Sequence, residues 1–230
     1  MARRWSRLAR HATRPRLTAF AAGLCIAAGQ APLGLWPVAL LGLALAACIW
    51  IGAQGARQAA FLGWLIGFAH FLFALNWIVN PFLVEPWRHG WMIPFALFLM
   101  AGGLALFWAL AFCMAKILKS GLSGLAAVWG GAELARGHVF TGFPWAMPGY
   151  IWIDTPVAQL AALIGPYGLT MLGFAFAALL VFAAQRRSVR LAGVSLVLFA
   201  LVWAGGAYRE AQPLPEKTGH NIRVVQPNAP

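Results

Sequence analysis

Glu133 and Arg136 are a pair whose types and spacing could do chemistry, because they stand three residues apart near the end of an apolar stretch. On a helix this spacing puts both side chains on one face, within reach of an ion pair. Ionisable groups at membrane depth are costly and by default indicate a functional site. The alternative is an ion pair that only anchors a helix end at the membrane interface. The sequence leaves both interpretations open.

Other reactive side chains show no spacing typical of catalysis or metal binding. The 5 histidines lack HxxxH and HExxH patterns, and the 3 cysteines lack a CxxC pair and an activating His or acidic neighbour. No serine lies in a GxSxG motif. The residues concerned are His11, His70, His89, His138, His220, Cys25, Cys48 and Cys113. We therefore expect no metal site and no cofactor.

Residues 138–150, HVFTGFPWAMPGY, break the apolar pattern without becoming polar. Glycines and prolines prevent a regular helix here, so the backbone groups need partners from protein, water or a lined cavity. The glycines and prolines are Gly142, Pro144, Pro148 and Gly149, and the nearby rings are Phe140, Phe143, Trp145, Tyr150 and Trp152. Aromatic rings favour the depth of the membrane interface. The stretch predicts a re-entrant or interfacial loop, and a connection anchored by an aromatic belt is the alternative.

The elements that must position these residues are long apolar runs. Of the 230 residues, 62% are hydrophobic and only 10% are charged, against about 25% charged in an average soluble domain. A membrane-spanning helix needs about 20 mostly apolar residues. Runs of this kind lie near residues 17–31, 34–52, 58–79, 92–115, 121–136, 165–185 and 191–207. The sequence predicts an all-α polytopic membrane protein with about seven transmembrane helices, with Gly63 and Gly67 allowing close helix packing.

The positions of the charges predict the orientation of these helices. Lys and Arg number 17 against 5 acidic residues, a balance that would suggest nucleic acid as the partner of a soluble chain. Twelve of the cations fall in every second connection, at Arg3, Arg4, Arg7, Arg10, Arg14, Arg16, Arg57, Lys116, Lys119, Arg186, Arg187 and Arg190. Cytoplasmic loops carry such an excess. We therefore expect a cytoplasmic N-terminus, residues after 207 on the outer side, and no nucleic acid partner.

The two ends of the chain differ from the apolar middle. The basic N-terminal residues are typical of a helix lying on an anionic membrane surface or of a disordered anchor. A polar, proline-bearing linker leads into NIRVVQPNAP, where Ile222, Val224 and Val225 predict a short strand. A lone strand cannot pair its backbone, so it predicts the start of a further domain. The expected organisation is a basic segment at 1–16, a transmembrane domain at 17–207, a linker at 208–221 and the start of a truncated domain at 222–230.

At residues 132–172 the chain resembles the apolipoprotein N-acyltransferases, the bacterial enzymes of the last step of lipoprotein maturation. The similar features are TGFPW at 141–145, Gly149 followed by Tyr150, Asp154, and GPYGLTML at 165–172. The resemblance extends to APLGLWPVALLGLAL at 31–45, NWI at 76–78 and IRVVQPNAP at 222–230. The last of these resembles the first strand of the family's α/β nitrilase-like domain.

This resemblance implies an acyltransferase of the bacterial inner membrane that needs no cofactor. Its donor would be a phospholipid and its acceptor the α-amino group of a diacylglyceryl-cysteine lipoprotein, with residues after 207 in the periplasm. In the family a Cys nucleophile, a Glu base and a Lys carry the reaction in the nitrilase-like domain. Those three residues are expected beyond Pro230, so we predict that these 230 residues alone are inactive.

The resemblance also implies roles for residues of this chain. Phe143, Pro144, Trp145 and Tyr150 are expected to line a lateral entrance for acyl chains. Glu133 and Arg136 are expected near the lipid headgroup or as a brace for the loop. Trp77 is the remaining candidate for substrate binding, although an aromatic belt residue beside a capping Asn76 explains it equally well.

Two other functions remain as alternatives at this stage. A transporter or a lipid-binding scaffold without covalent chemistry would share the apolar composition. A transporter is expected to show paired ionisable residues or broken helices near the middle of the membrane, whereas the charges here gather at the ends of the apolar runs.

Overall fold

A computed structural model describes residues 15–213 and Arg223. Within these residues the chain is helical and has no strand. Each predicted apolar run contains one main α-helix: α2 Pro15–Ala27, α3 Trp36–Gly52, α4 Ala56–Ala74, α6 Ile93–Ile117, α7 Gly121–Arg136, α8 Ala161–Arg186 and α9 Val189–Glu210. Shorter elements connect them: η1 Asn76–Leu83, α5 Pro86–His89, η2 Gly90–Met92, η3 Val139–Thr141, η4 Pro148–Trp152 and η5 Pro156–Leu160. Residues 1–14 of the basic segment expected at 1–16 lie outside the described residues, and so does the expected strand at 222–225 apart from Arg223.

The lengths of these helices support part of the expected set of membrane spans. Three segments, Pro86–Ile117, Pro156–Arg186 and Val189–Glu210, are long and apolar enough to cross a membrane. A fourth is obtained if α4 and η1 count as one span bent by 45°. The 13 residues of α2 extend only about 20 Å, against about 30 Å of hydrocarbon. The described residues therefore show a helical protein with three or four candidate membrane spans by length and composition, and the remaining expected spans stay a prediction.

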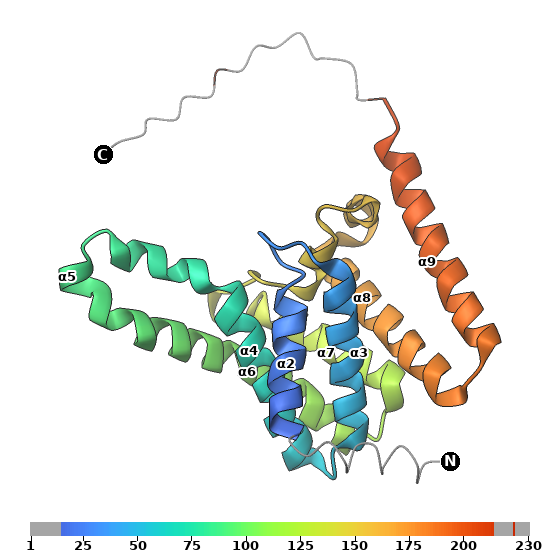
Figure 1. The fold of residues 1–230 in the computed structure, drawn as a ribbon, viewed down its shortest axis with the longest axis horizontal. Coiled ribbons are helices and arrows are strands. Elements are labelled where there is room, and N and C mark those ends of the chain that lie inside the picture. The colour runs from blue at the N-terminus through green and yellow to red at the C-terminus, as the bar shows by residue number, and fades with distance from the viewer. Residues whose placement is uncertain (1–14, 214–222, 224–230) are drawn as a thin grey trace.

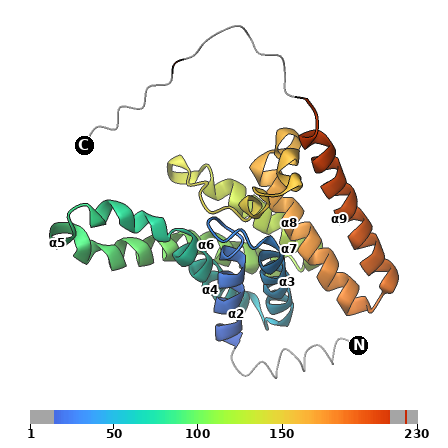
Figure 2. The ribbon, with the colours of Figure 1, turned by 45° about the horizontal axis from the view of Figure 1, so that its top comes forward.

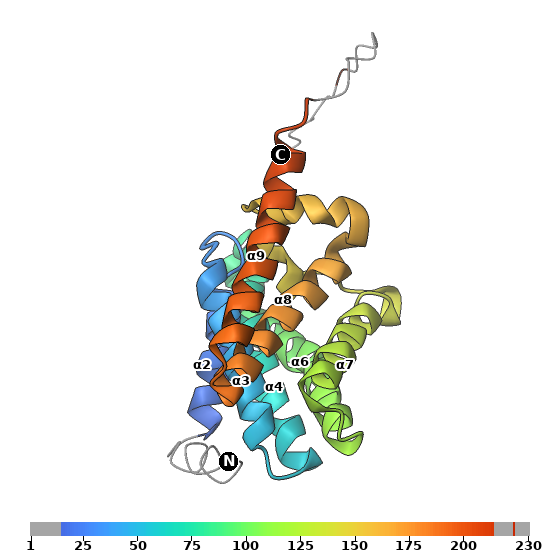
Figure 3. The same cartoon turned by 90° about the vertical axis from the view of Figure 1, so that its right-hand side faces the viewer.

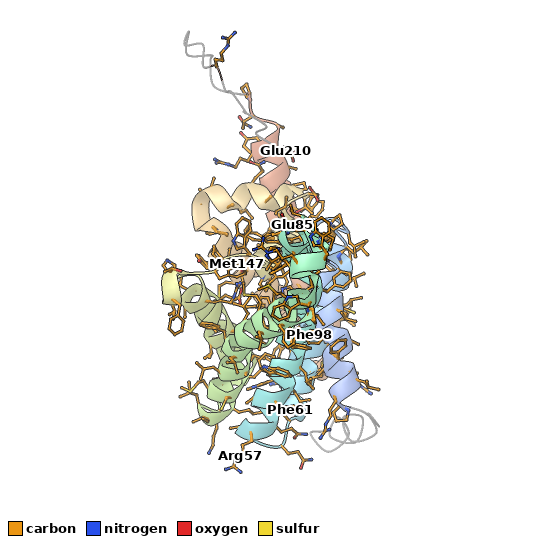
Figure 4. All side chains as sticks on the ribbon, turned by 90° about the vertical axis from the view of Figure 1, so that its left-hand side faces the viewer. Arg57, Phe61, Glu85, Phe98, Met147 and Glu210 are labelled. Carbon is orange, nitrogen blue, oxygen red and sulfur yellow. The ribbon has the colours of Figure 1, made fainter. Side chains whose placement is uncertain are left out.

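The connections alternate between two ends of the bundle. The turns from α3 to α4, from α6 to α7 and from α8 to α9 lie toward the lower end in Figure 1, and the long connection from α7 to α8 lies toward the upper end, as Figure 3 also shows. In Figure 4, Arg57 lies at one end, and Glu85 and Glu210 lie toward the other. The two ends therefore differ in charge in the way that the sequence pattern predicts.

Small residues let the central helices approach closely. A Cβ atom on Gly63 of α4 would lie 2.9 Å from the Trp108 carbonyl oxygen of α6, and one on Gly67 would lie 3.1 Å from the Ala105 Cα. This confirms the predicted packing role of both glycines. The buried rings of Trp108, Phe112 and Trp129 fill the space beside this contact.

An arm extends away from the bundle between α4 and α6, with α5 near its tip (Figures 1 and 2). The third apolar run was expected to be one helix to residue 79, but α4 ends at Ala74. Asn76 Nδ2 donates to the Phe73 carbonyl at 2.7 Å, which confirms the capping amide. The chain then bends by 45° between Ala74 and Asn76 and continues as the 3-10 helix η1, which contains Pro81.

Candidate functional site

Arg136 ties the end of α7 to the loop that follows it. The Nη1 atom of Arg136 donates a hydrogen bond to the Phe143 carbonyl and another, at 2.9 Å, to the Trp145 carbonyl. The Phe143 N–H returns a hydrogen bond to the Arg136 carbonyl at 2.9 Å. The guanidinium also lies 5.0 Å from the centre of the Phe71 ring of α4, in the range of a cation–π contact. The side chain therefore connects α7, α4 and the loop.

Glu133 neutralises the charge of Arg136 inside the protein. Arg136 Nη2 lies 2.6 Å from Glu133 Oε2, and Arg136 Nε donates to Oε1 at 3.0 Å. The Trp108 indole N–H adds a third donor to Oε1 at 2.7 Å. Both charged side chains are 0% exposed, so desolvation is compensated only by these contacts. The predicted ion pair is confirmed, and it lies within the bundle instead of at a solvated helix end.

Three further buried side chains hold the next backbone groups of the loop. His70 Nε2 lies 2.8 Å from the Ala146 carbonyl, and since a carbonyl only accepts, the ring proton must be on Nε2. Gln30 Nε2 donates to the Met147 carbonyl at 3.0 Å. The Gly149 N–H donates to Thr170 Oγ1 at 3.0 Å. With Arg136, side chains from four segments of the chain fix residues 143–149, and we call these four residues the loop clamp.

The loop carries backbone strain as well as these contacts. Of five non-glycine residues with positive φ in the described chain, three lie here, at Phe140 (53°), Thr141 (75°) and Ala146 (55°). Each such residue costs on the order of 1–3 kcal/mol and persists only where its surroundings impose it. At Ala146 the hydrogen bond from His70 supplies part of that restraint.

The ring of Trp145 points outward while the backbone is held inside. Trp145 is 55% exposed and Pro144 is also exposed, whereas Phe143 and Tyr150 are half-buried. Trp77 of η1 is 47% exposed and meets Trp145 edge-on, with ring centres 5.8 Å apart. The fold thus brings together two candidate residues that are 68 positions apart in the chain.

Tyr150 follows the loop in η4, outside the candidate spans. Burial raises the pKa of its hydroxyl above the ordinary value of 10.0, Tyr167 and Glu133 act in the same direction, and Arg136 opposes them. The hydroxyl is therefore a neutral donor and acceptor at physiological pH.

The loop lies below the outermost level of the molecule. In Figure 4, Met147 is deeper than Glu85 and Glu210 and far from Arg57. Met147 is 1% exposed and Ala146 is 8% exposed. A non-helical backbone at such a depth needs protein partners, and the loop clamp supplies them.

The sequence interpretation missed His70, Gln30, Thr170 and Trp108. The available signal was the isolated polar residue within an apolar run, as in FAHF for His70, which is itself a reason to suspect a function. The partners of His70, Gln30 and Thr170 are backbone groups of the loop, and the partner of Trp108 is the Glu133 carboxylate. No spacing rule reports such contacts.

The described residues contain no group of three His, Cys, Asp or Glu side chains that could hold a metal ion. Cys25, Cys48 and Cys113 are free thiols in α2, α3 and α6.

The fold and the site define a class: a helical membrane protein whose long connection between two helices is clamped inside one end of the bundle. The chain belongs to the apolipoprotein N-acyltransferase family, since residues 22–179 match the model of the family's N-terminal domain. That match includes α3, α4, α6, α7, the loop and most of α8.

Relatives from several bacteria agree with this membership. The chain is 36% identical over 231 residues to the apolipoprotein N-acyltransferase of Caulobacter vibrioides, and the aligned region covers 96% of this chain and 43% of the relative. It is 36% identical to that of Sinorhizobium medicae, over 90% of this chain and 42% of the relative. It is 34% identical to that of Rhodopseudomonas palustris, over 92% of this chain and 42% of the relative. The chain therefore spans a little under half the length of these relatives.

Proposed function

We propose that this chain is the membrane portion of an enzyme that transfers an acyl chain from a phospholipid to the α-amino group of a lipoprotein's N-terminal diacylglyceryl-cysteine. Membership of the family supports the reaction class. The observation that carries the assignment to this part of the chain is the clamped loop, whose backbone is buried while Trp145 is exposed beside Trp77. Such a rigid apolar edge suits the positioning of acyl chains.

In this proposal the chemistry takes place above the loop, on a Cys thiolate of a nitrilase-like domain that follows Pro230. The thiolate attacks the donor ester, a thioester forms and a lysophospholipid leaves. The lipoprotein amine then attacks the thioester, an amide forms and the thiol is regenerated. The Glu base accepts the proton of the thiol and later returns it. Splitting the transfer into two steps is the usual advantage of covalent catalysis.

We assign the site residues to two roles. Phe143, Pro144, Trp145, Tyr150 and Trp77 line the lateral entrance for acyl chains. Glu133 and Arg136 brace the loop, because both side chains are fully buried and their contacts go to loop carbonyls and to Trp108.

We also propose an orientation in the bacterial inner membrane, with the N-terminus in the cytoplasm and residues after 207 in the periplasm. The cationic turns lie at one end of the bundle, and Glu85 and Glu210 lie toward the other. All seven main helices would then enter the bilayer, with α2, α3 and α7 shorter than its full thickness. The domain boundaries expected from the sequence, at 16, 207 and 221, follow from the same orientation.

A transporter is less well supported by the same pair of charges. In a transporter, intramembrane charges contact the substrate or the coupling ion. Here three donors occupy the Glu133 carboxylate, and loop carbonyls occupy Arg136.

The reading frame that follows the codon of Pro230 tests the assignment at the gene level. We expect it to encode a nitrilase-sized domain that contains Glu, Lys and Cys in that order, followed by another apolar span. A stop codon at this position would contradict the proposed enzyme, and sequencing of the locus distinguishes the two outcomes.

Replacing Trp145 by alanine tests the role of the loop in the full-length enzyme. We expect kcat/KM for phospholipid-dependent acylation to fall by up to roughly tenfold, because the edge-to-face contact of Trp145 with Trp77 is worth about 0.5–1.5 kcal/mol. The melting temperature should stay within about 2 °C, since the ring is 55% exposed.

Trp87 offers the matched control for this substitution. It lies in the arm, is 83% exposed and has no ring partner among the described residues. Trp87→Ala should leave kcat/KM unchanged. Equal losses in both variants would show that any outer tryptophan matters for membrane attachment, and would remove the entrance assignment.

A further inference from the structure

A hollow lies away from the loop clamp, where α9 ends beside η5 and the start of α8. It is a half-open depression of about 410 Å³ on the surface of the described residues. Its lining is Gln159, Leu160, Leu163, Gly205, Gly206, Tyr208, Arg209 and Gln212. None of these residues belongs to the loop or to its clamp.

Two consecutive glycines of α9, Gly205 and Gly206, line this hollow. A Cβ atom on Gly206 would lie 2.0 Å from the Pro156 carbonyl oxygen, so Gly206 lets α9 approach η5 closely. A Cβ atom on Gly205 would have no atom within 4 Å. Gly205 therefore faces space that a side chain could fill, while Gly206 holds the two walls together.

The hollow lies at the depth of lipid headgroups. The 22 residues of α9 extend about 33 Å, close to the thickness of the hydrocarbon core. The lining residues from α9 fall in its last two turns and just after it, and Leu163 lies near the start of the candidate span Pro156–Arg186. Both walls are therefore ends of candidate spans, where water, headgroups and acyl chains meet.

The lining is apolar on one side and polar on the other. Leu160 and Leu163 offer an apolar wall, and Leu163 is 70% exposed. Arg209 is exposed and forms no ion pair with any described residue. Gln212 Nε2 donates to the Tyr208 carbonyl at 3.1 Å, which leaves its amide oxygen to accept a hydrogen bond. A cation, two amides and an apolar wall at the interface match a phosphate headgroup with its acyl chains.

The negative charges near the hollow indicate which headgroup fits. Glu210 follows Arg209, and the carbonyl groups at the end of α9 add a partial negative charge. These groups lie beside the hollow and reduce its attraction for a purely anionic headgroup. A headgroup that carries an amine beside its phosphate satisfies both signs.

We propose that this hollow binds one phospholipid with a zwitterionic headgroup, with its phosphate on Arg209 and an acyl chain along Leu160 and Leu163. The bound lipid fills the space above Gly205 and joins α9 to η5. This site is separate from the loop at 142–150, and it does not depend on the proposed acyl transfer.

The test is native mass spectrometry of the 230-residue chain in detergent micelles, titrated with phosphatidylethanolamine and, in parallel, with diacylglycerol. We expect one saturable phosphatidylethanolamine adduct and much weaker binding of diacylglycerol. Gly205→Leu should weaken phosphatidylethanolamine binding at least about tenfold because leucine occupies the hollow. Arg209→Gln should weaken it about fivefold.

Two matched controls keep the test specific. Gly193→Leu changes another α9 glycine whose Cβ would also have no atom within 4 Å, and Arg88→Gln removes an exposed cation of the arm that is paired with Glu85. Both should bind like the parent chain. Since leucine favours helix over glycine, both leucine variants should fold.

Several results would overturn the proposal. If diacylglycerol binds as tightly as phosphatidylethanolamine, the headgroup does not contact the protein as proposed. If Gly193→Leu weakens binding as much as Gly205→Leu does, the lipid does not bind in this hollow. Absence of any lipid adduct on the parent chain would contradict a lipid ligand. A dimer that Gly205→Leu dissociates would assign the hollow to a second copy of the chain instead.

Discussion

Replacing Arg136 by methionine should lower the thermal midpoint of the purified protein by roughly 6–20 °C. The substitution leaves Glu133 charged, fully buried and without its ion-pair partner, and breaking a buried pair in this way costs about 3–5 kcal/mol. For a chain of this size, each kcal/mol corresponds to about 2–4 °C. The carbonyls of Phe143 and Trp145 also lose their donor. Intrinsic fluorescence on heating in detergent measures the midpoint.

Arg88 provides the control for the loss of an arginine charge. Its contact with Glu85 is 3.8 Å long, and its side chain is 73% exposed, so Arg88→Met should change the midpoint by less than about 3 °C. The double variant Glu133→Gln with Arg136→Met should lose less stability than the two single variants lose in sum, because the two residues are partners in one ion pair and their effects are coupled. A midpoint for Arg136→Met within 2 °C of the parent would show that the pair does not brace the fold.

Replacing Gly149 by alanine should displace the loop through a steric clash with α8. The new Cβ atom would lie 2.6 Å from the Pro166 carbonyl oxygen and 2.8 Å from the Thr170 backbone nitrogen. Backbone atoms cannot swing aside, so we expect about 1–3 kcal/mol of overpacking and about 1 kcal/mol from the weakened bond to Thr170. Chemical denaturation of the solubilised protein measures this loss, and the full-length enzyme should lose activity in parallel.

Gly131 separates this effect from a general effect of glycine substitution. It lies in α7, and a Cβ atom there would meet nothing within 4 Å. Gly131→Ala should therefore leave stability unchanged or raise it by up to about 1 kcal/mol. If Gly149→Ala behaves in the same way, the loop does not pack against α8 as described.

The helices of this protein were predictable because hydropathy is a local signal. Each of the seven apolar runs contains one main α-helix, and the break at residues 138–150 coincides with an irregular connection whose only regular elements are the short 3-10 helices η3 and η4. Gly142 and Pro144 prevent one continuous helix across this stretch, because glycine is conformationally permissive and proline lacks the backbone N–H. Pro148 and Gly149 lie at the start of the short helix η4. The number of spans was less predictable, since α2 and α7 have only 13 and 16 residues. A short helix that packs inside a bundle is also apolar, so an apolar run does not by itself distinguish a membrane span from a buried helix.

The candidate site was predictable only where its residues are neighbours in the chain. Glu133 and Arg136 share a helix face at three-residue spacing, and they form the expected pair. The contact of Trp77 with Trp145 and the hydrogen bonds from His70 and Gln30 join residues that are at least 68 positions apart. No spacing rule covers such distances.

The sequence by itself determined the helical membrane character, the difference in charge between the two ends, the irregular loop and the Glu133–Arg136 pair. Each of these depends on composition or on spacing within one helix. Only the tertiary structure decided that the pair is buried, that the Arg136 guanidinium also donates to the loop carbonyls, and that Trp145 is left exposed. The physical reason is that an unsatisfied backbone group inside the bundle is costly wherever it lies, and only the packed helices determine which distant side chain can reach it.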